Sequence, residues 1–380
     1  MGPGTSEPTA IIGEHPESEA AMFQAAIVGA TGVVGQQFVV ALQSHPWFRI
    51  TVLAASERSA GKTYGEALRS DSGAFQWYCD EAAAPEIVTM PVVEAGGLDS
   101  REVDVVFSAL ETAPAKELEP GFARHAAVIS TARAFRDDPD VPVLIPGVNS
   151  DHVGLVHRQR AERGWDGFIA TQPNCTTTGL AVTLRPLMDR FGVRQVLMTS
   201  MQALSGAGRD GVPGMAILDN LIPYIPNEEQ RVEIESRKIL GRLGEGVIEP
   251  AQFRLSCTCT RVNVMDGHTE SVFLSLDRSV PLSEVRGAME DYAPVLREAG
   301  LPSAPDHMIV VHADPFRPQP RLDRATEDGM ATVVGRLRED GALDNGVKYV
   351  LLSHNTKMGA AKGAVLMAEL AVKEGLIHGR

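Results

Sequence analysis

A cysteine in a threonine-rich segment is the first residue of this chain whose surroundings suggest covalent chemistry. Cys175 lies in the run Pro-Asn-Cys-Thr-Thr-Thr-Gly at residues 173–179, just before a pattern that predicts a helix over residues 177–190. The start of a helix favours a thiolate, because its N–H groups and dipole carry partial positive charge. The same N–H groups, helped by Asn174, are suited to stabilising the oxyanion of a tetrahedral intermediate. A lone buried cysteine is more often inert packing, so that alternative stays open here.

Two charged residues further along the chain are spaced so that both lie on one side of an expected helix. Glu235 and Lys238 are three residues apart in a segment, 228–243, that reads as a helix, so they share one helix face. A surface ion pair has the same spacing and is the commoner outcome outside a functional context.

A glycine-rich turn near the start of the chain suggests a dinucleotide site. Gly29, Gly32 and Gly35 follow a predicted strand at residues 25–28 and precede a predicted helix at residues 35–42. Glycines let the backbone turn tightly and approach a pyrophosphate, which the helix N-terminus then binds. The spacing is G-x-x-G-x-x-G rather than the common G-x-G-x-x-G, so an ordinary glycine-rich turn is the alternative.

The segment after the next predicted strand bears on the choice of cofactor. An NAD site tends to place a carboxylate there for the ribose hydroxyls. Here Ser56, Arg58 and Ser59 could instead hold a 2′-phosphate, which favours NADP, although Glu57 complicates this interpretation. A solvated polar loop is the simpler alternative.

Length and composition limit the classes of protein that the chain can form. Its 380 residues, 44% hydrophobic and 22% charged, suit two globular domains. A net charge of −14 disfavours nucleic-acid binding, and no run of about 18 apolar residues offers a membrane span. The four cysteines lack zinc-site spacing and disulfide density, so we expect reduced thiols and no metal. Residues 1–21 lack the features of a secretion signal, so we expect a cytoplasmic protein.

The order of expected elements predicts an α/β protein with two kinds of sheet. Widely spaced apolar runs allow crossover connections and so predict a Rossmann-type, doubly wound parallel sheet; they lie at residues 25–28, 50–54, 103–107 and 126–129. Segments 194–201 and 270–276 alternate apolar and polar residues, which predicts a mostly antiparallel sheet with one covered face. An apolar helix is expected at residues 364–373.

These elements divide the chain into an extension and two domains. We expect residues 1–22 to form a flexible extension, because prolines and glycines recur in them. Residues 23–149 and 355–380 are expected to form the dinucleotide-binding domain. Residues 150–354 are expected to form an α+β catalytic and dimerisation domain.

Ten ordered motifs together resemble the aspartate-semialdehyde dehydrogenase family, especially its archaeal and fungal branch. They lie at residues 29–35, 56–62, 130–133, 145–149, 173–179, 201–208, 235–238, 261–268, 317–321 and 355–361. The resemblance runs from about Phe23 to the end of the chain. Two departures are Gln172, where related sequences often have Asn, and the acidic N-terminal extension, which has no counterpart.

The resemblance implies roles for individual residues. It makes Cys175 the nucleophile and His268 the general acid and base, a pairing that suits an imidazole with a pKa near neutrality. Gln202 is implied to orient the bound intermediate. Arg261, seven residues before His268 and expected on the same strand, is implied to clamp the substrate α-carboxylate.

The remaining implied contacts involve the substrate's other charges and the cofactor. Glu235 is assigned to the substrate ammonium, and Lys238 with Arg133 to its phosphate. The cofactor NADP is expected to contact Gly29, Thr31, Gly32, Val33, Val34, Gly35, Ser56, Arg58, Ser59, Ser108, Ser205, Gly206 and Asn355. The resemblance also implies a homodimer or homotetramer.

The implied reaction converts L-4-aspartyl phosphate to L-aspartate 4-semialdehyde through a thioester on Cys175, with NADPH as reductant, in lysine, methionine and threonine biosynthesis. Two close alternatives keep the chemistry but change the acyl group, as in N-acetylglutamyl-phosphate reductases and malonyl-CoA reductases. A third is a non-catalytic paralogue that keeps only the dinucleotide-binding fold.

Overall fold

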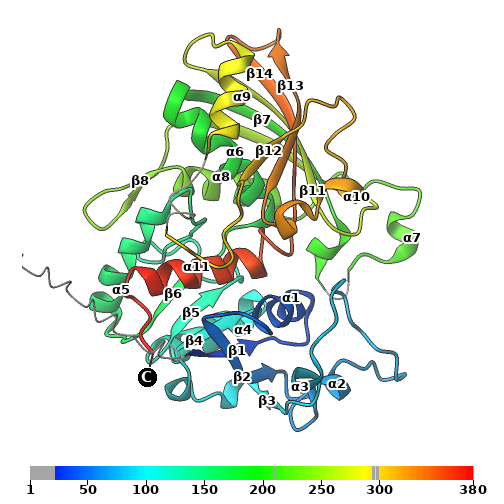
Figure 1. Cartoon of the computed structure of the whole chain (residues 1–380), viewed down its shortest axis with the longest axis vertical. Helices are drawn as coiled ribbons and strands as arrows, with labels where there is room; N and C mark the ends of the chain where they lie inside the picture. Colours follow the sequence, from blue (N-terminus) through cyan, green and yellow to red (C-terminus); the bar gives the residue numbers. More distant parts are fainter. Residues whose placement is uncertain (1–21, 209–210, 293–295, 297–298, 380) are drawn as a thin grey trace, which may run out of the picture.

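A computed structural model describes residues 22–379 except residues 209–210, 293–295 and 297–298 (Figure 1). All but Met22 of the expected extension at residues 1–22 lies outside the described residues. Two six-stranded sheets, one in each half of the molecule, organise the rest (Figure 1).

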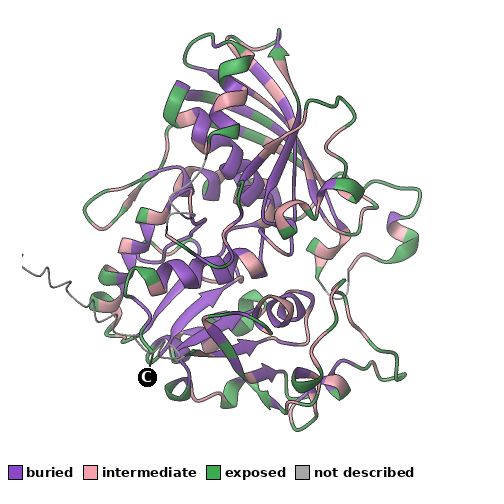
Figure 2. Ribbon diagram, in the orientation of Figure 1, coloured by how far each residue is buried: buried purple, intermediate pink, exposed green. Residues whose placement is uncertain are grey.

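The first sheet is parallel and has the strand order β3-β2-β1-β4-β5-β6. Its strands are β1 (Phe23–Val28), β2 (Phe48–Ala55), β3 (Val92–Glu94), β4 (Val105–Ser108), β5 (Ala127–Ser130) and β6 (Phe168–Thr171). The predicted doubly wound sheet is confirmed. Strands β4, β5 and β6 are buried on both faces, as parallel strands between helix layers should be (Figure 2).

Helices cover both faces of this sheet. One layer contains α1 (Val33–Leu42), α5 (Leu155–Arg163) and α11 (Ala361–Lys373), and α4 (Thr112–Ala123) covers the opposite face. The C-terminal helix α11 packs against α1, β4 and β5, so the end of the chain lies on the first sheet. The short helices α2 (Tyr64–Ala67) and α3 (Pro85–Val88) pack together beside β3.

The second sheet has the order β10-β7-β11-β14-β13-β12. Its strands are β7 (Val193–Gln202), β10 (Arg254–Arg261), β11 (His268–Leu276), β12 (Ile309–Val311), β13 (Thr332–Asp340) and β14 (Gly346–Ser353). Three of its pairings are antiparallel, and the two at its edges are parallel. The predicted alternation is confirmed along β11, where buried and half-buried residues alternate from His268 to Phe273.

Helix α6 (Cys175–Phe191) covers the inner face of the second sheet, between α8 (Glu228–Ile239) and α9 (Leu282–Glu290). The segment predicted as one helix over residues 228–243 ends earlier than expected. Residues 242–243 form strand β8 (Arg242–Leu243), which pairs with β9 (Ile248–Glu249). The short helices α7 (Gly214–Ile217) and α10 (Pro320–Asp323) lie at the periphery.

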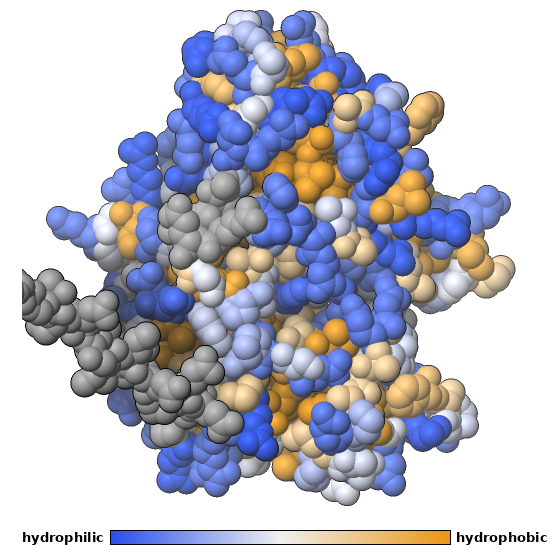
Figure 3. Space-filling model, in the orientation of Figure 1, coloured by the Kyte–Doolittle hydropathy of each residue, from blue (hydrophilic) through white to orange (hydrophobic). Residues whose placement is uncertain are grey.

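The described chain crosses between the two sheets at two places. It leaves β6 for α6 through residues 172–174, and it returns from β14 to α11 through residues 354–360. The domain limits expected at residues 149 and 354 stay a prediction. The face of the molecule drawn in Figure 3 is mostly hydrophilic, and none of the described helices is both long and apolar enough to span a membrane.

Candidate active site

Cys175 is the first residue of α6, and Asn174 caps that helix. The Asn174 side-chain oxygen accepts hydrogen bonds from the backbone N–H groups of Thr176 (2.9 Å) and Thr177 (3.2 Å). This is the usual way to satisfy the free N–H groups at a helix start. The cap fixes the thiol at the positive end of a helix of 17 residues.

His268, the first residue of β11, lies beside this thiol. Its Nε2 is 3.1 Å from Cys175 Sγ, while its Nδ1 accepts a hydrogen bond from the Ala203 backbone N–H at 3.1 Å. Burial, with a smaller effect from the Arg261 charge, lowers the pKa of His268 to about 3, so the ring is neutral. A neutral ring whose Nδ1 accepts a hydrogen bond carries its proton on Nε2. In this arrangement His268 donates to the sulfur, whereas the sequence interpretation expected it to take the thiol proton. Its role as general acid and base stays a prediction.

The thiol itself is strongly perturbed. Burial raises the pKa of Cys175 to about 12, and the negative charge of Glu228 adds to this effect. The positive charges of Arg261 and Arg136 and the Thr176 N–H act in the opposite direction. The ligand-free protein therefore holds Cys175 as a thiol at neutral pH.

Alkylation of the ligand-free protein should reveal this state. We expect the rate of inactivation by iodoacetamide to rise about tenfold per pH unit between pH 7 and 10, because only the thiolate reacts. Residual activity against time at each pH gives the rate. A plateau at or below pH 8 would contradict the raised pKa.

Gln202 lies at the end of β7 and is held by a carboxylate that the sequence interpretation missed. Its Nε2 donates to Glu228 Oε1 at 3.2 Å, and the Asn174 Nδ2 donates to the same oxygen at 2.8 Å. Glu228 begins α8 and is buried, with 5% of its surface exposed. One carboxylate thus orients both amides that were assigned to the reaction.

Arg261 is held near the thiol, but not on the strand of His268. It ends β10, whereas His268 begins β11, and β7 separates the two strands in the sheet. The expectation of a single strand is therefore wrong, because the chain turns between residues 261 and 268. Arg261 Nη1 donates to the Ala203 backbone oxygen at 2.7 Å, and among the described residues its guanidinium has no second hydrogen bond, so its remaining N–H groups are suited to a ligand.

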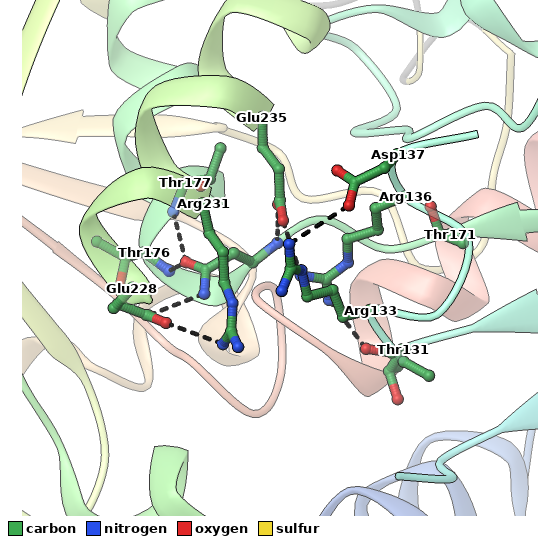
Figure 4. Close-up of polar contacts among 12 residues, drawn as sticks. Thr131, Arg133, Arg136, Asp137, Thr171, Thr176, Thr177, Glu228, Arg231 and Glu235 are labelled. Atoms are coloured by element: carbon green, nitrogen blue, oxygen red, sulfur yellow. Dashed lines mark hydrogen bonds and ion pairs between the residues drawn. The ribbon is translucent and has the colours of Figure 1, made fainter. Parts of the chain in front are cut away.

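The structure favours Arg136 over Arg133 as the buried arginine of the site (Figure 4). Arg136 is buried and pairs with Glu235 at 3.1 Å, and it also donates to the Thr131 backbone oxygen at 2.9 Å. Arg133 is far more exposed and pairs with Asp137 on the surface. Both arginines line the cavity described below, but only Arg136 is rigidly held.

Glu235 and Lys238 share one face of α8 but do not line that cavity. Both oxygens of Glu235 have partners, because the second accepts the Asn174 backbone N–H at 2.6 Å. Lys238 Nζ donates to the backbone oxygens of residues 136, 138 and 141, which uses all three of its hydrogens. Burial lowers the pKa of Lys238. In this arrangement the two residues hold Asn174 and the Arg136 loop instead of reaching substrate.

A cavity of about 450 Å³ lies between the two sheets and brings these groups together. Residues of both sheets contribute to its lining. Those assigned from the sequence to the substrate or the reaction are Asn174, Cys175, Arg133 and Arg261, and those assigned to the cofactor are Val34, Ser205, Gly206 and Asn355. Glu228, Arg231 and Arg136 also line it and were missed; the only sequence signal for them was their nearness to assigned motifs.

The glycine turn has the geometry that close approach of a cofactor requires. Gly29 has φ +80°, and a Cβ there would lie 2.7 Å from the Ala109 backbone oxygen. A Cβ at Gly35 would lie 2.1 Å from the Gly29 oxygen, so these two positions require glycine. Gly32 caps α1 without a side chain, and no acidic residue occupies the first turn of that helix. The N-terminus of α1 is thus suited to a pyrophosphate.

The other expected cofactor residues differ in their placement. Thr31 and Val33 belong to the turn and the start of α1, while Ser56 and Arg58 are exposed just after β2. Ser59 is buried beneath that loop. The Ser108 side chain is fully buried beside Glu119 at the end of β4, and its contact with the cofactor stays a prediction. The described residues contain no cluster of three or more His, Cys, Asp and Glu suited to a metal.

Comparisons with known proteins agree with this architecture. Residues 24–156 match the family "Semialdehyde dehydrogenase, NAD binding domain", and residues 184–358 match "Semialdehyde dehydrogenase, dimerisation domain". The aspartate-semialdehyde dehydrogenase of Methanothermobacter thermautotrophicus is 48% identical over 349 residues, which cover 92% of this chain and 99% of that protein. The chain belongs to the aspartate-semialdehyde dehydrogenase family.

Solved structures of aspartate-semialdehyde dehydrogenases share the whole fold. That of Candida albicans, with NADP, has a TM-score of 0.84 and 38% identity, and the match covers 94% of this chain and all of that one. A Vibrio cholerae enzyme complexed with ASA has a TM-score of 0.73 and 26% identity, covering 93% and 99% of the two chains. The first sheet is therefore the NAD(P)-binding domain of the family, and the second sheet belongs to its dimerisation domain.

Proposed function

We propose that the protein catalyses the NADP-dependent reductive dephosphorylation of L-4-aspartyl phosphate to L-aspartate 4-semialdehyde. The observation that carries this proposal is the contact of 3.1 Å between Cys175 Sγ and His268 Nε2, beside a cavity that Arg136 and Arg261 also line. A nucleophile between two fixed cations suits a substrate with an anion at each end.

The first half of the reaction is acyl transfer to sulfur. The Cys175 sulfur forms a C–S bond with the acyl carbon, and the C–O bond to phosphate breaks with its electron pair on the leaving phosphate. The leaving phosphate takes the proton that the Cys175 thiol gives up, and Arg136 holds that phosphate. The His268 Nε2–H and the N-terminus of α6 stabilise the oxyanion of the tetrahedral intermediate.

The second half reduces the thioester. The bound nicotinamide cofactor supplies a hydride to the acyl carbon, and a thioester accepts hydride far more readily than a carboxylate. Gln202 and Asn174, held by Glu228, orient the acyl group during this step. The C–S bond then breaks, which restores the Cys175 thiolate and leaves the aldehyde.

The proposal of NADP over NAD rests on the loop after β2. Ser56 and Arg58 are exposed there, where they could reach a ribose 2′-phosphate. The solved Candida albicans relative contains NADP. The homodimer or homotetramer expected from the resemblance belongs to the same proposal, supported by exposed apolar residues on the second half, such as Leu197 and Met215. The cytoplasmic location stays a prediction.

The direct test mixes purified protein, phosphate and L-aspartate semialdehyde with NADP or NAD and follows absorbance at 340 nm. We expect phosphate-dependent reduction that is faster with NADP. No reduction with this substrate, but reduction with N-acetylglutamate semialdehyde, or with malonate semialdehyde and CoA, would favour the alternative acyl groups. Failure of all three would favour the non-catalytic alternative.

A further inference from the structure

Glu119 is a buried acidic residue that the proposed chemistry does not use. It lies on α4 and has no exposed surface. Its Oε1 is 2.6 Å from Ser130 Oγ, at the end of β5, and its carboxyl group also contacts the side chain of Ser108, at the end of β4. The loops that follow these two strands, residues 109–112 and 131–136, contribute to the lining of the cavity. One side chain therefore joins the two strand ends from which part of the active site is built.

The Ser130 hydroxyl connects this carboxyl group to the second of these loops. Ser130 Oγ accepts the Ala132 backbone N–H at 3.1 Å, so its own hydrogen can donate to Glu119. Ala132 lines the cavity, whereas Glu119 does not. The start of the loop is thus held by a side chain that lies outside the cavity.

Thr131 connects the same loop to Arg136. Its backbone N–H and its hydroxyl donate to the Ser108 backbone oxygen at 2.9 and 3.1 Å. Its own backbone oxygen accepts from Arg136 Nη2 at 2.9 Å (Figure 4). The position of the guanidinium that the proposed function assigns to phosphate therefore depends on the ends of β4 and β5, which Glu119 joins.

Burial favours the neutral form of this carboxyl group. It raises the pKa of Glu119 to about 7, while the neighbouring serine hydroxyls act in the opposite direction. Strands β4, β5 and β6 pack against α4 without an ionisable side chain, and the arginines of the loop line the cavity. Arg101 and Glu102, on a 3-10 helix that also packs against α4, are exposed. Lys116 and Glu117 on α4 are exposed as well, so none of these groups offers a buried cation.

The neutral form also satisfies two buried atoms that otherwise lack a hydrogen-bond partner among the described residues. These atoms are Glu119 Oε2 and Ser108 Oγ. A proton on Oε2 can donate to Ser108 Oγ while Oε1 accepts from Ser130. Both strand ends are then bonded to one uncharged side chain.

We propose that Glu119 is a positioning residue for phosphate binding; this rests on the proposed function. Its carboxyl group holds the ends of β4 and β5 together, and through the loop that begins at Thr131 it keeps Arg136 directed at the phosphate. It touches neither substrate nor cofactor, so its effect on activity passes through Arg136.

The first test measures KM for phosphate in the oxidative direction. Glu119→Leu removes the carboxyl group and Ser130→Ala removes the hydroxyl, whereas Glu119→Gln keeps an acceptor for Ser130 and a donor for Ser108. We expect KM for phosphate to rise about tenfold in Glu119→Leu and in Ser130→Ala, because each loses a hydrogen bond that positions the loop. In Glu119→Gln it should stay within about twofold of wild type, since both hydrogen bonds can form. KM for NADP should change in none of them.

Two further comparisons separate positioning from a general loss of structure. In the Arg136→Met background, Ser130→Ala should raise KM for phosphate no further, because the residue through which it acts is gone. Glu117→Leu, at an exposed position on α4, should leave this KM unchanged. An unchanged KM for phosphate in Ser130→Ala, or an additional rise in the Arg136→Met background, would overturn the proposal. Ser130→Ala removes a single atom and so decides the matter even if Glu119→Leu does not fold.

The second test addresses the proton. A carboxyl group whose pKa is raised by folding destabilises the protein as the pH rises through that pKa. The Tm of Glu119→Gln minus that of wild type should therefore be several degrees larger at about pH 8 than at about pH 5. An equal difference at both pH values would overturn the neutral form. Wild-type protein that does not reduce NADP with L-aspartate semialdehyde would overturn the proposed function; the tenfold effect of Ser130→Ala is then sought in the Kd of inorganic phosphate, measured by calorimetry.

Discussion

Replacing Cys175 with alanine is expected to lower kcat by about 10⁴-fold or more, because no other described residue that lines the cavity carries a thiol for the acyl intermediate. Steady-state absorbance at 340 nm gives the rate. NADP binding, followed by fluorescence titration, should be unchanged, since the glycine turn and α1 do not depend on the thiol. Wild-type protein mixed with aspartyl phosphate without cofactor should gain the mass of an aspartyl group, and Cys175→Ala should not.

The matched control for this experiment is Cys257→Ala. Cys257 is a partly buried thiol on β10 that does not line the cavity. Its replacement should leave both the rate and the acyl adduct intact. An adduct that persists in Cys175→Ala would show that another residue is the nucleophile.

Replacing Arg136 with methionine is expected to lower kcat/KM by about 100- to 1,000-fold, because truncating one partner of a buried ion pair costs about 2–5 kcal/mol. The loss has two sources: the phosphate loses its cation, and Glu235 keeps an unpaired buried charge. The measurement is kcat/KM for phosphate in the oxidative direction, together with Tm.

A second variant separates these two sources. In Arg136→Met with Glu235→Gln, the charge at residue 235 is gone while an oxygen still accepts the Asn174 N–H. We expect Tm to recover and activity not to recover. Arg133 is the exposed neighbour of Arg136, and a solvated charge contributes little to binding phosphate. Arg133→Ala should therefore change kcat/KM for phosphate by less than about tenfold. A larger effect at Arg133 than at Arg136 would restore the original assignment.

The sequence predicted the fold from local patterns, and the resemblance to the family predicted the Cys175–His268 pair. Apolar runs, the glycine turn and the residues around a helix start are readable over a few positions. The sequence could not predict in this way which of Arg133 and Arg136 is the buried arginine of the site. The two lie three residues apart in a loop, and only tertiary contacts with Glu235 on α8 separate them.

The remaining errors also come from long-range packing. Glu235 and Lys238 share a helix face as predicted, and Glu228 lies two turns earlier on that same face. Only the N-terminal part of the face lines the cavity, whereas the part with Glu235 and Lys238 contacts the Arg136 loop. No pattern within α8 distinguishes the two. Likewise, the role of His268 depends on which ring nitrogen the Ala203 N–H contacts, and residue 203 belongs to a different strand connection.

The two chain crossings between the sheets have a consequence for motion. Gln172 Nε2, in one crossing, donates to the Met358 oxygen in the other at 2.9 Å, and a Cβ at Gly359 would lie only 3.0 Å from Cys175 Cβ. If the two halves of the molecule bend toward each other over bound ligands, the bending must occur at these two crossings. Such a pivot would place the nucleophile where displacement is smallest.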